Sequence, residues 1–154
     1  MKNVIISITG TQHNYGDDSL PVGDETIELV TDGSYEYGEE ESLFTYRESE
    51  LTGMDGTLTT FRVEKDMVTM TREGAVNSQM LFQKGRKHLF LYDTPFGAMT
   101  MGVSTQKLSS EMDEHGGVMD LVYSVDVDNI LLGKNVFRIC VKEIGNDNKG
   151  EFGI

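Results

Sequence analysis

Hydrophobic and polar residues alternate along most of this chain, which is the period of half-buried β-strands. The alternation is clearest over residues 25–30, 57–64 and 118–127. Turn-forming residues separate the alternating runs, as at Asp55-Gly56, where glycine supplies the positive φ that a hairpin needs. We therefore predict strands over 4–9, 25–37 with a pause at Asp32-Gly33, 43–48, 57–64, 67–73, 78–83, 88–92, 98–108, 118–127 and 135–144.

About ten strands, with turn signals roughly every 8–12 residues, are typical of an all-β sandwich or barrel. Because the hairpins are sequential and their links are short, an antiparallel up-and-down meander is favoured, and closing it into a barrel removes exposed strand edges. We expect a loop over 13–18 and place the one candidate for a short helical turn within 105–115. We predict one β-barrel domain over residues 1–154, with 145–154 as a frayed tail.

The net charge of the chain excludes some classes of binding partner. Thirteen Lys and Arg residues stand against 26 Asp and Glu residues, which gives a formal net charge of −13. A chain this acidic is repelled by nucleic-acid phosphates and by anionic lipid surfaces, so we expect neither partner. The densest basic cluster, at 84–88, falls in an expected hairpin turn and is interpreted as solvated.

Cysteine usage and hydropathy point to the cytoplasm. The single cysteine, Cys140, excludes an internal disulfide framework. The apolar stretch at the start of the chain is too short for a signal peptide, and no run reaches transmembrane length. Cytoplasmic localisation is therefore the expectation.

Several short strings match a known pattern, in the same order and over nearly the whole chain. They are Tyr46-Arg47-Glu48, Leu51-Thr52-Gly53-Met54, Gly56-Thr57, Thr71-Arg72-Glu73-Gly74, Ser78-Gln79-Met80-Leu81-Phe82, Tyr92-Asp93-Thr94-Pro95-Phe96-Gly97 and Asp120-Leu121-Val122-Tyr123. Together they resemble the YwiB-like family of small bacterial proteins, a domain of unknown function. The resemblance implies a calycin-like β-barrel of the lipocalin or streptavidin kind, and it transfers no activity.

Motifs for catalysis and metal binding are missing from the sequence. The three histidines, His13, His88 and His115, form no spaced pair with another ligand residue. There is no Gly-x-Ser-x-Gly elbow, no base near Cys140 in sequence and no glycine-rich phosphate loop. We therefore predict no metal, no cofactor and no catalytic residue. The hypothesis that the protein is an enzyme has no sequence motif to support it.

The barrel interior is the more specific place to look for function. Val68, Met70 and Arg72 share one face of a strand, so an inward face puts Arg72 near one end of the barrel. Because a buried unpaired charge is very costly, Arg72 then needs a partner. It either clamps a ligand carboxylate or phosphate, or pairs with a Glu or backbone carbonyls, or reaches solvent at the rim.

Methionines and tyrosines complete the candidate ligand-binding set. Flexible thioethers suit an adaptable apolar cavity and also serve as core filler. Tyrosine hydroxyls either bind a ligand or cap the core at the rim. The candidates are Arg72, Met70, Met80, Met99, Met101, Tyr46, Tyr92 and Tyr123.

Two functional hypotheses follow from this set. The first is a small-molecule-binding barrel that holds an apolar or amphipathic anionic ligand. The alternative is a non-catalytic interaction or structural protein that acts through an outer face or as a homodimer. Whether the barrel interior is hollow or packed decides between them.

Overall fold

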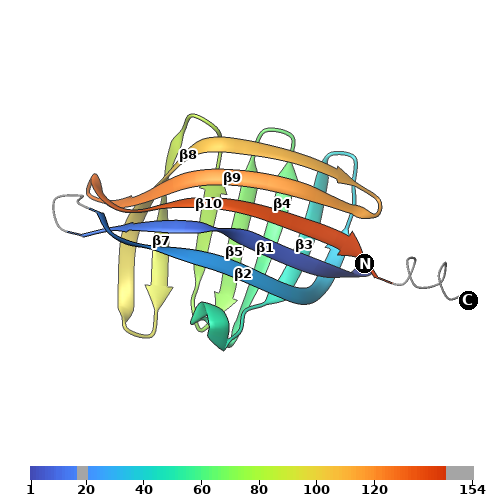
Figure 1. The fold of residues 1–154 in the computed structure, drawn as a ribbon, viewed down its shortest axis with the longest axis horizontal. Helices are drawn as coiled ribbons and strands as arrows, with labels where there is room; N and C mark the ends of the chain where they lie inside the picture. Colours follow the sequence, from blue (N-terminus) through green and yellow to red (C-terminus); the bar gives the residue numbers. More distant parts are fainter. Residues whose placement is uncertain (17–20, 145–154) are drawn as a thin grey trace, which may run out of the picture.

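Ten antiparallel strands follow one another along the chain and form one sheet (Figure 1). The computed structural model describes residues 1–16 and 21–144, so residues 17–18 of the expected loop and the expected tail at 145–154 lie outside the described residues. The strands are β1 (Lys2–Tyr15), β2 (Pro21–Glu36), β3 (Glu41–Arg47), β4 (Thr57–Glu64), β5 (Val68–Gly74), β6 (Ser78–Phe82), β7 (Lys87–Thr94), β8 (Gly97–Asp113), β9 (Gly116–Val127) and β10 (Ile130–Glu143). The predicted up-and-down barrel is confirmed.

The barrel is nearly closed, because its first and last strands pair. β1 and β10 are antiparallel neighbours from Val4–Glu143 to Asn14–Gly133. The one interruption in the strand order lies between β6 and β7. There the Asn77 and Asp93 backbones exchange N–H···O bonds of 2.8 and 2.9 Å, and a second isolated bridge joins Lys84 to Thr105. The seam is therefore held at its two ends.

The strands form two layers that cross at a steep angle, as in orthogonal sheet packing. β1, β2, β8, β9 and β10 run across the front of the molecule, and β3 to β7 run behind them (Figure 1). β2 pairs with β3 only at Ser34–Glu36, and the rest of β2 pairs with β1 alone. The two layers thus join at this bend, and they join again where β8 pairs with β7 over Gly97–Ser104.

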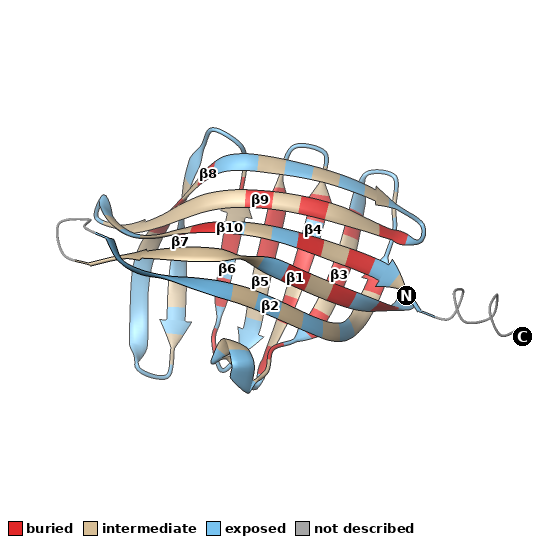
Figure 2. Cartoon of the chain, in the orientation of Figure 1, coloured by how far each residue is buried: buried red, intermediate tan, exposed pale blue. Residues whose placement is uncertain are grey.

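The core fills the space between the layers near the bend. Figure 2 shows buried residues concentrated where the front layer crosses β3, β4 and β5. Tyr35 and Phe44 are fully buried, and the Phe44 and Phe61 rings stack with centroids 4.8 Å apart. Such a pair adds about 0.5–1.5 kcal/mol beyond the burial of its area. Apolar packing therefore stabilises this end of the barrel most.

Two local predictions were wrong, and one short element was not predicted. Residues 105–113 hold no helical turn, because they are part of β8. A bulge between Thr105 and Lys107 adds one residue to this strand, so the inward positions change from odd numbers, as at Val103, to even numbers, as at Leu108. β1 continues to Tyr15, into the expected loop, because its polar end pairs with both neighbouring strands. A single 3-10 turn, η2 (Glu50–Thr52), follows β3 and was not expected.

Close packing at Gly10 gives a testable expectation. A Cβ added there would collide with the carbonyl oxygen of Val136 and with the ring of Phe137. We expect Gly10→Ala to lower the free energy of unfolding by about 2 kcal/mol, because overpacking forces neighbouring atoms to move. Urea denaturation measures this change. Gly133→Ala is the matched control, because its nearest neighbour is the His13 oxygen at 3.4 Å, and an equal loss in both variants would contradict the assignment.

Candidate functional site

A cavity of about 580 Å³ lies between the two layers where they separate. This volume falls within the range of roughly 300–1,000 Å³ that is typical of small-molecule sites. The cavity is lined by Ile8, Gln12, Glu25, Thr26, Ile27, Glu28, Leu29, Tyr46, Glu48, Leu51, Thr52, Gly53, Met54, Phe61, Met70, Arg72, Phe82, Tyr92, Leu121, Tyr123, Phe137 and Ile139. The barrel interior is therefore hollow at this end and packed at the other.

Aromatic rings from both layers form much of the cavity wall. The Tyr123 ring of β9 contacts Phe82 of β6, with centroids 4.8 Å apart, and lies 6.3 Å from Phe137 of β10. Phe137 is paired with Gly10 of β1, and the missing side chain of that glycine leaves room for the ring. This part of the wall is thus aromatic and carried by strands.

The cavity mouth lies between β2 and the η2 segment. Residues 25–29 of β2 border one side and residues 51–54 border the other. The η2 turn is shaped locally: the Ser49 hydroxyl accepts a hydrogen bond from the Leu51 amide, and Gly53, at φ 76°, ends the turn. Leu51 is 85% exposed, so an apolar side chain stands in water beside the mouth.

The polar part of the wall contains one ion pair, besides Gln12, Glu25 and Glu28. Glu48 directly follows β3, its side chain is 1% exposed, and its Oε2 lies 3.8 Å from Nε of Arg72 on β5. The same Oε2 accepts a 2.5 Å hydrogen bond from the Thr59 hydroxyl on β4. A separation of 3.8 Å is too long for a hydrogen bond, so Glu48 balances the charge of Arg72 without using its Nε–H.

Among the described residues, two neighbouring polar atoms at or beside this wall have no hydrogen bond. They are Arg72 Nε and Ser78 Oγ, both buried, and the two residues face each other across β5 and β6. A buried polar atom without a partner costs about 1–3 kcal/mol. Arg72 on β5 and Ser78 on β6 therefore offer hydrogen-bonding groups beside the cavity that no other group of the described residues uses.

The tyrosines near this ion pair are held neutral. Burial raises the pKa of Tyr46 well above its ordinary value, and the negative charge of Glu48 raises it further. Burial also raises the pKa of Tyr123, while the positive charge of Arg72 partly opposes that shift. Both residues consequently present neutral hydroxyl groups at ordinary pH.

The structure brings together five of the eight candidate residues, namely Tyr46, Met70, Arg72, Tyr92 and Tyr123, around the cavity. Met80 is buried in the core and Met101 packs against the core. Met99 is 51% exposed and lies outside the cavity lining. The sequence left the partner of Arg72 unnamed. Glu48 was missed, although the alternation Phe44, Tyr46, Glu48 already placed it on the inward face.

Residues 1–16 and 21–144 contain neither a metal-binding cluster nor a membrane-spanning helix. No group of three or more His, Cys, Asp and Glu side chains in this part of the chain is arranged to hold a metal ion. None of its helices has the length and hydropathy to cross a membrane.

Fold and site together define an antiparallel up-and-down β-barrel with an internal cavity. A crystal structure of the ywiB protein from Bacillus subtilis shares this fold, with a TM-score of 0.78 over 94% of this chain and 93% of that chain, at 22% identity. The "Uncharacterized beta-barrel protein YwiB" of Bacillus subtilis (strain 168) is 28% identical over 103 residues, which is 67% of this chain and 71% of that protein. The family described as "Domain of unknown function (DUF1934)" matches residues 6–139, and the chain belongs to this family. The family resemblance noted in the sequence is confirmed.

The ion pair predicts an asymmetry between single and double variants. Arg72→Met leaves the carboxylate of Glu48 buried without its positive partner, so we expect the free energy of unfolding to fall by about 3 kcal/mol. Arg72→Met combined with Glu48→Gln removes both charges and should recover most of that loss. Urea denaturation at neutral pH tests both variants. A double variant no more stable than the single one would show that Glu48 does not depend on Arg72.

The raised pKa values of Tyr46 and Tyr123 predict an alkaline transition. The folded protein holds these two protons more tightly than the unfolded chain. Their contribution to stability is therefore complete below the ordinary tyrosine pKa, about 10, and is lost as the pH rises toward the raised values. Burial also raises the pKa of the fully buried Tyr35, so tyrosinate absorbance should show three of the six tyrosines ionising only together with loss of the near-ultraviolet circular dichroism. Ionisation of all six in the native state near the ordinary pKa would contradict the burial of these hydroxyls.

Proposed function

We propose that this protein binds a small amphipathic molecule in the cavity between its two layers. The observation that carries the proposal is the cavity itself: about 580 Å³, with aromatic rings in its wall and with Arg72 as its one cationic side chain beside the carboxylates of Glu25, Glu28 and Glu48. An apolar pocket with a few convergent polar groups is the usual form of a small-molecule site. Barrels of similar strand number, such as lipocalins, hold one small ligand in this way, which supports the proposal by analogy of fold.

The polar group of the ligand is a hydrogen-bond acceptor, with a carboxylate as its strongest form. Arg72 is the only Lys or Arg among the residues that line the cavity, and its buried Nε–H has no partner among the described residues. A guanidinium carries five N–H donors, so Glu48 at 3.8 Å leaves most of them available. A carboxylate on Arg72 would form charge-assisted hydrogen bonds, which are about twice as strong as neutral ones.

The apolar part of the ligand extends along the aromatic wall toward the mouth. Phe82, Tyr123 and Phe137 form a continuous ring surface on that path. Flexible Met70 beside this wall adapts to chains of different shape. An aromatic or alkyl carboxylate matches both the polar and the apolar parts of the cavity.

Two matched fluorescent probes test this proposal: a dansyl-labelled undecanoate and a dansyl-labelled amine of the same chain length. We expect the carboxylate to bind more tightly by about tenfold, which is the effect of one charge-assisted hydrogen bond. The preference should disappear in the double variant Arg72→Met/Glu48→Gln. Dansyl emission during titration reports both affinities.

A tryptophan at Ile27 serves as the blocking variant, because Ile27 lines the mouth on the inward face of β2. We expect Ile27→Trp to weaken binding of both probes. Leu89→Trp is the matched control, because Leu89 is 72% exposed and lies outside the cavity lining. Equal binding by the wild type and Ile27→Trp, or tighter binding of the amine, would contradict the proposed site.

A further inference from the structure

The outer edge of β2 is unpaired over most of its length. From Pro21 to Gly33 this strand pairs with β1 on one side and with no described strand on the other. The stretch is roughly 40 Å long at about 3.3 Å per residue. An open edge presents a row of backbone N–H and C=O groups that a second extended chain is able to pair with.

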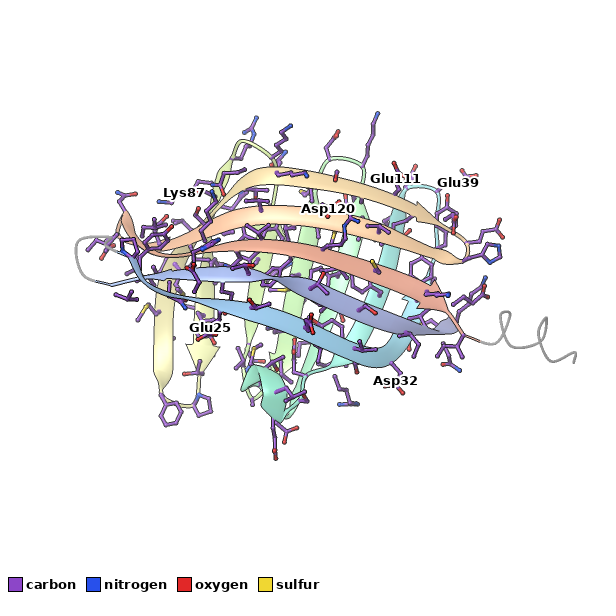
Figure 3. The ribbon with its side chains drawn as sticks, viewed as in Figure 1. Glu25, Asp32, Glu39, Lys87, Glu111 and Asp120 are labelled. Atoms are coloured by element: carbon purple, nitrogen blue, oxygen red, sulfur yellow. The ribbon has the colours of Figure 1, made fainter. Side chains whose placement is uncertain are left out.

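Every charged side chain on the same stretch of β2 is acidic. It contains Asp24, Glu25, Glu28 and Asp32 and no Lys or Arg. Asp24 contacts His13 of β1, whereas Glu25, Glu28 and Asp32 form no ion pair within the described residues. Figure 3 shows Glu25 and Asp32 along this part of β2. Their charge is available to a partner.

The strand alternation gives the two sides of this edge different chemistry. Ile27 and Leu29 point inward beside the cavity mouth, and they pair with Gly10 and Ile8 of β1. Glu28 and Asp32 point outward, four residues apart, so they lie on one face of the strand. A strand added here would place alternate side chains over the apolar mouth and the others beside carboxylates.

We propose that the β2 edge binds an extended basic peptide by strand addition. Lysine or arginine side chains of the peptide pair with Glu28 and Asp32, and the alternating apolar side chains lie toward the cavity mouth. Backbone hydrogen bonds to β2 supply affinity that is independent of sequence, while the acidic and apolar faces select the sequence pattern.

Charge argues against a second copy of this chain as the occupant. Pairing two β2 edges would bring two acidic stretches together, and each chain carries a formal net charge of −13. Like charges directly opposite on neighbouring strands are destabilising. A basic peptide turns the same carboxylates into attractive contacts.

Strand addition at β2 does not depend on the proposed ligand. Arg72 lies on β5 in the cavity wall, whereas the peptide would contact the backbone and outward carboxylates of β2. The double variant Arg72→Met/Glu48→Gln should therefore lose the carboxylate preference and keep peptide binding. Failure of either idea is distinguishable from failure of the other.

Fluorescence anisotropy with a labelled peptide of alternating lysine and valine tests the proposal. We expect Glu28→Gln/Asp32→Asn to weaken binding by about tenfold, as for the loss of two ion pairs at a surface. The matched control is Glu39→Gln/Glu111→Gln, which removes the same charge away from β2 (Figure 3) and should leave binding unchanged.

Two N-methylated versions of the peptide test the backbone pairing itself. Methyl groups on one alternate set of amides block the peptide edge that faces β2, and methyl groups on the other set face solvent. We expect one version to lose binding and the other to retain it. Equal binding of both versions, or equal weakening by the two double variants, would overturn strand addition in favour of general attraction between charges. A concentration-dependent dimer in sedimentation that competes with the peptide would also overturn it, because a second copy would then occupy the edge.

Discussion

The rest of the structure depends on one constraint: the long front strand β2 pairs with the back layer only where it bends. Its contact with β3 is confined to Ser34–Glu36. Close packing is needed there, because a Cβ at Gly33 would collide with the carbonyl oxygen of Thr45. On one side of the bend the layers meet and exclude water. On the other side they separate, and this separation produces the cavity, its mouth and the unpaired edge together.

The two ends of the barrel therefore differ in packing and in the polar groups that they bury. The packed end holds Tyr35, Phe44 and Val68 with no exposure, and it supplies the rigidity on which the hollow end relies. The hollow end tolerates a buried ion pair and unpartnered donors, which lower stability and are usual at functional sites. Glu48 directly follows β3, Thr59 lies on β4 and Arg72 lies on β5. These three strands are neighbours, so the rigid sheet fixes the spacing of the three side chains.

Alternation and turn chemistry were enough to predict the ten-strand meander, because both depend on local sequence. They failed where a long-range constraint decides the outcome. The bulge at Gln106 changes the inward parity of β8, so the period-2 pattern predicted the strand only as far as residue 108 and left its later part as a candidate helical turn. The polar ends of β1 and β2 are strands because they pair with each other, not because they bury apolar surface. For the site, alternation placed Arg72 on the same face as Val68 and Met70, but which carboxylate meets Arg72 and which methionines face the cavity depend on how the two layers cross.

The pairing of β1 with β10 also has a consequence for biosynthesis. The first strand to leave the ribosome finds its second neighbour only when the last strand has been made, since the two strands stand at opposite ends of the sequence. Until then the apolar side chains of Val4, Ile6 and Ile8 have only a partial cover. Contacts this distant in sequence slow folding and prolong the exposure of apolar, aggregation-prone surface. Completion of the barrel therefore waits for the synthesis of β10, and a chain truncated before β10 would be a substrate for chaperones and proteases.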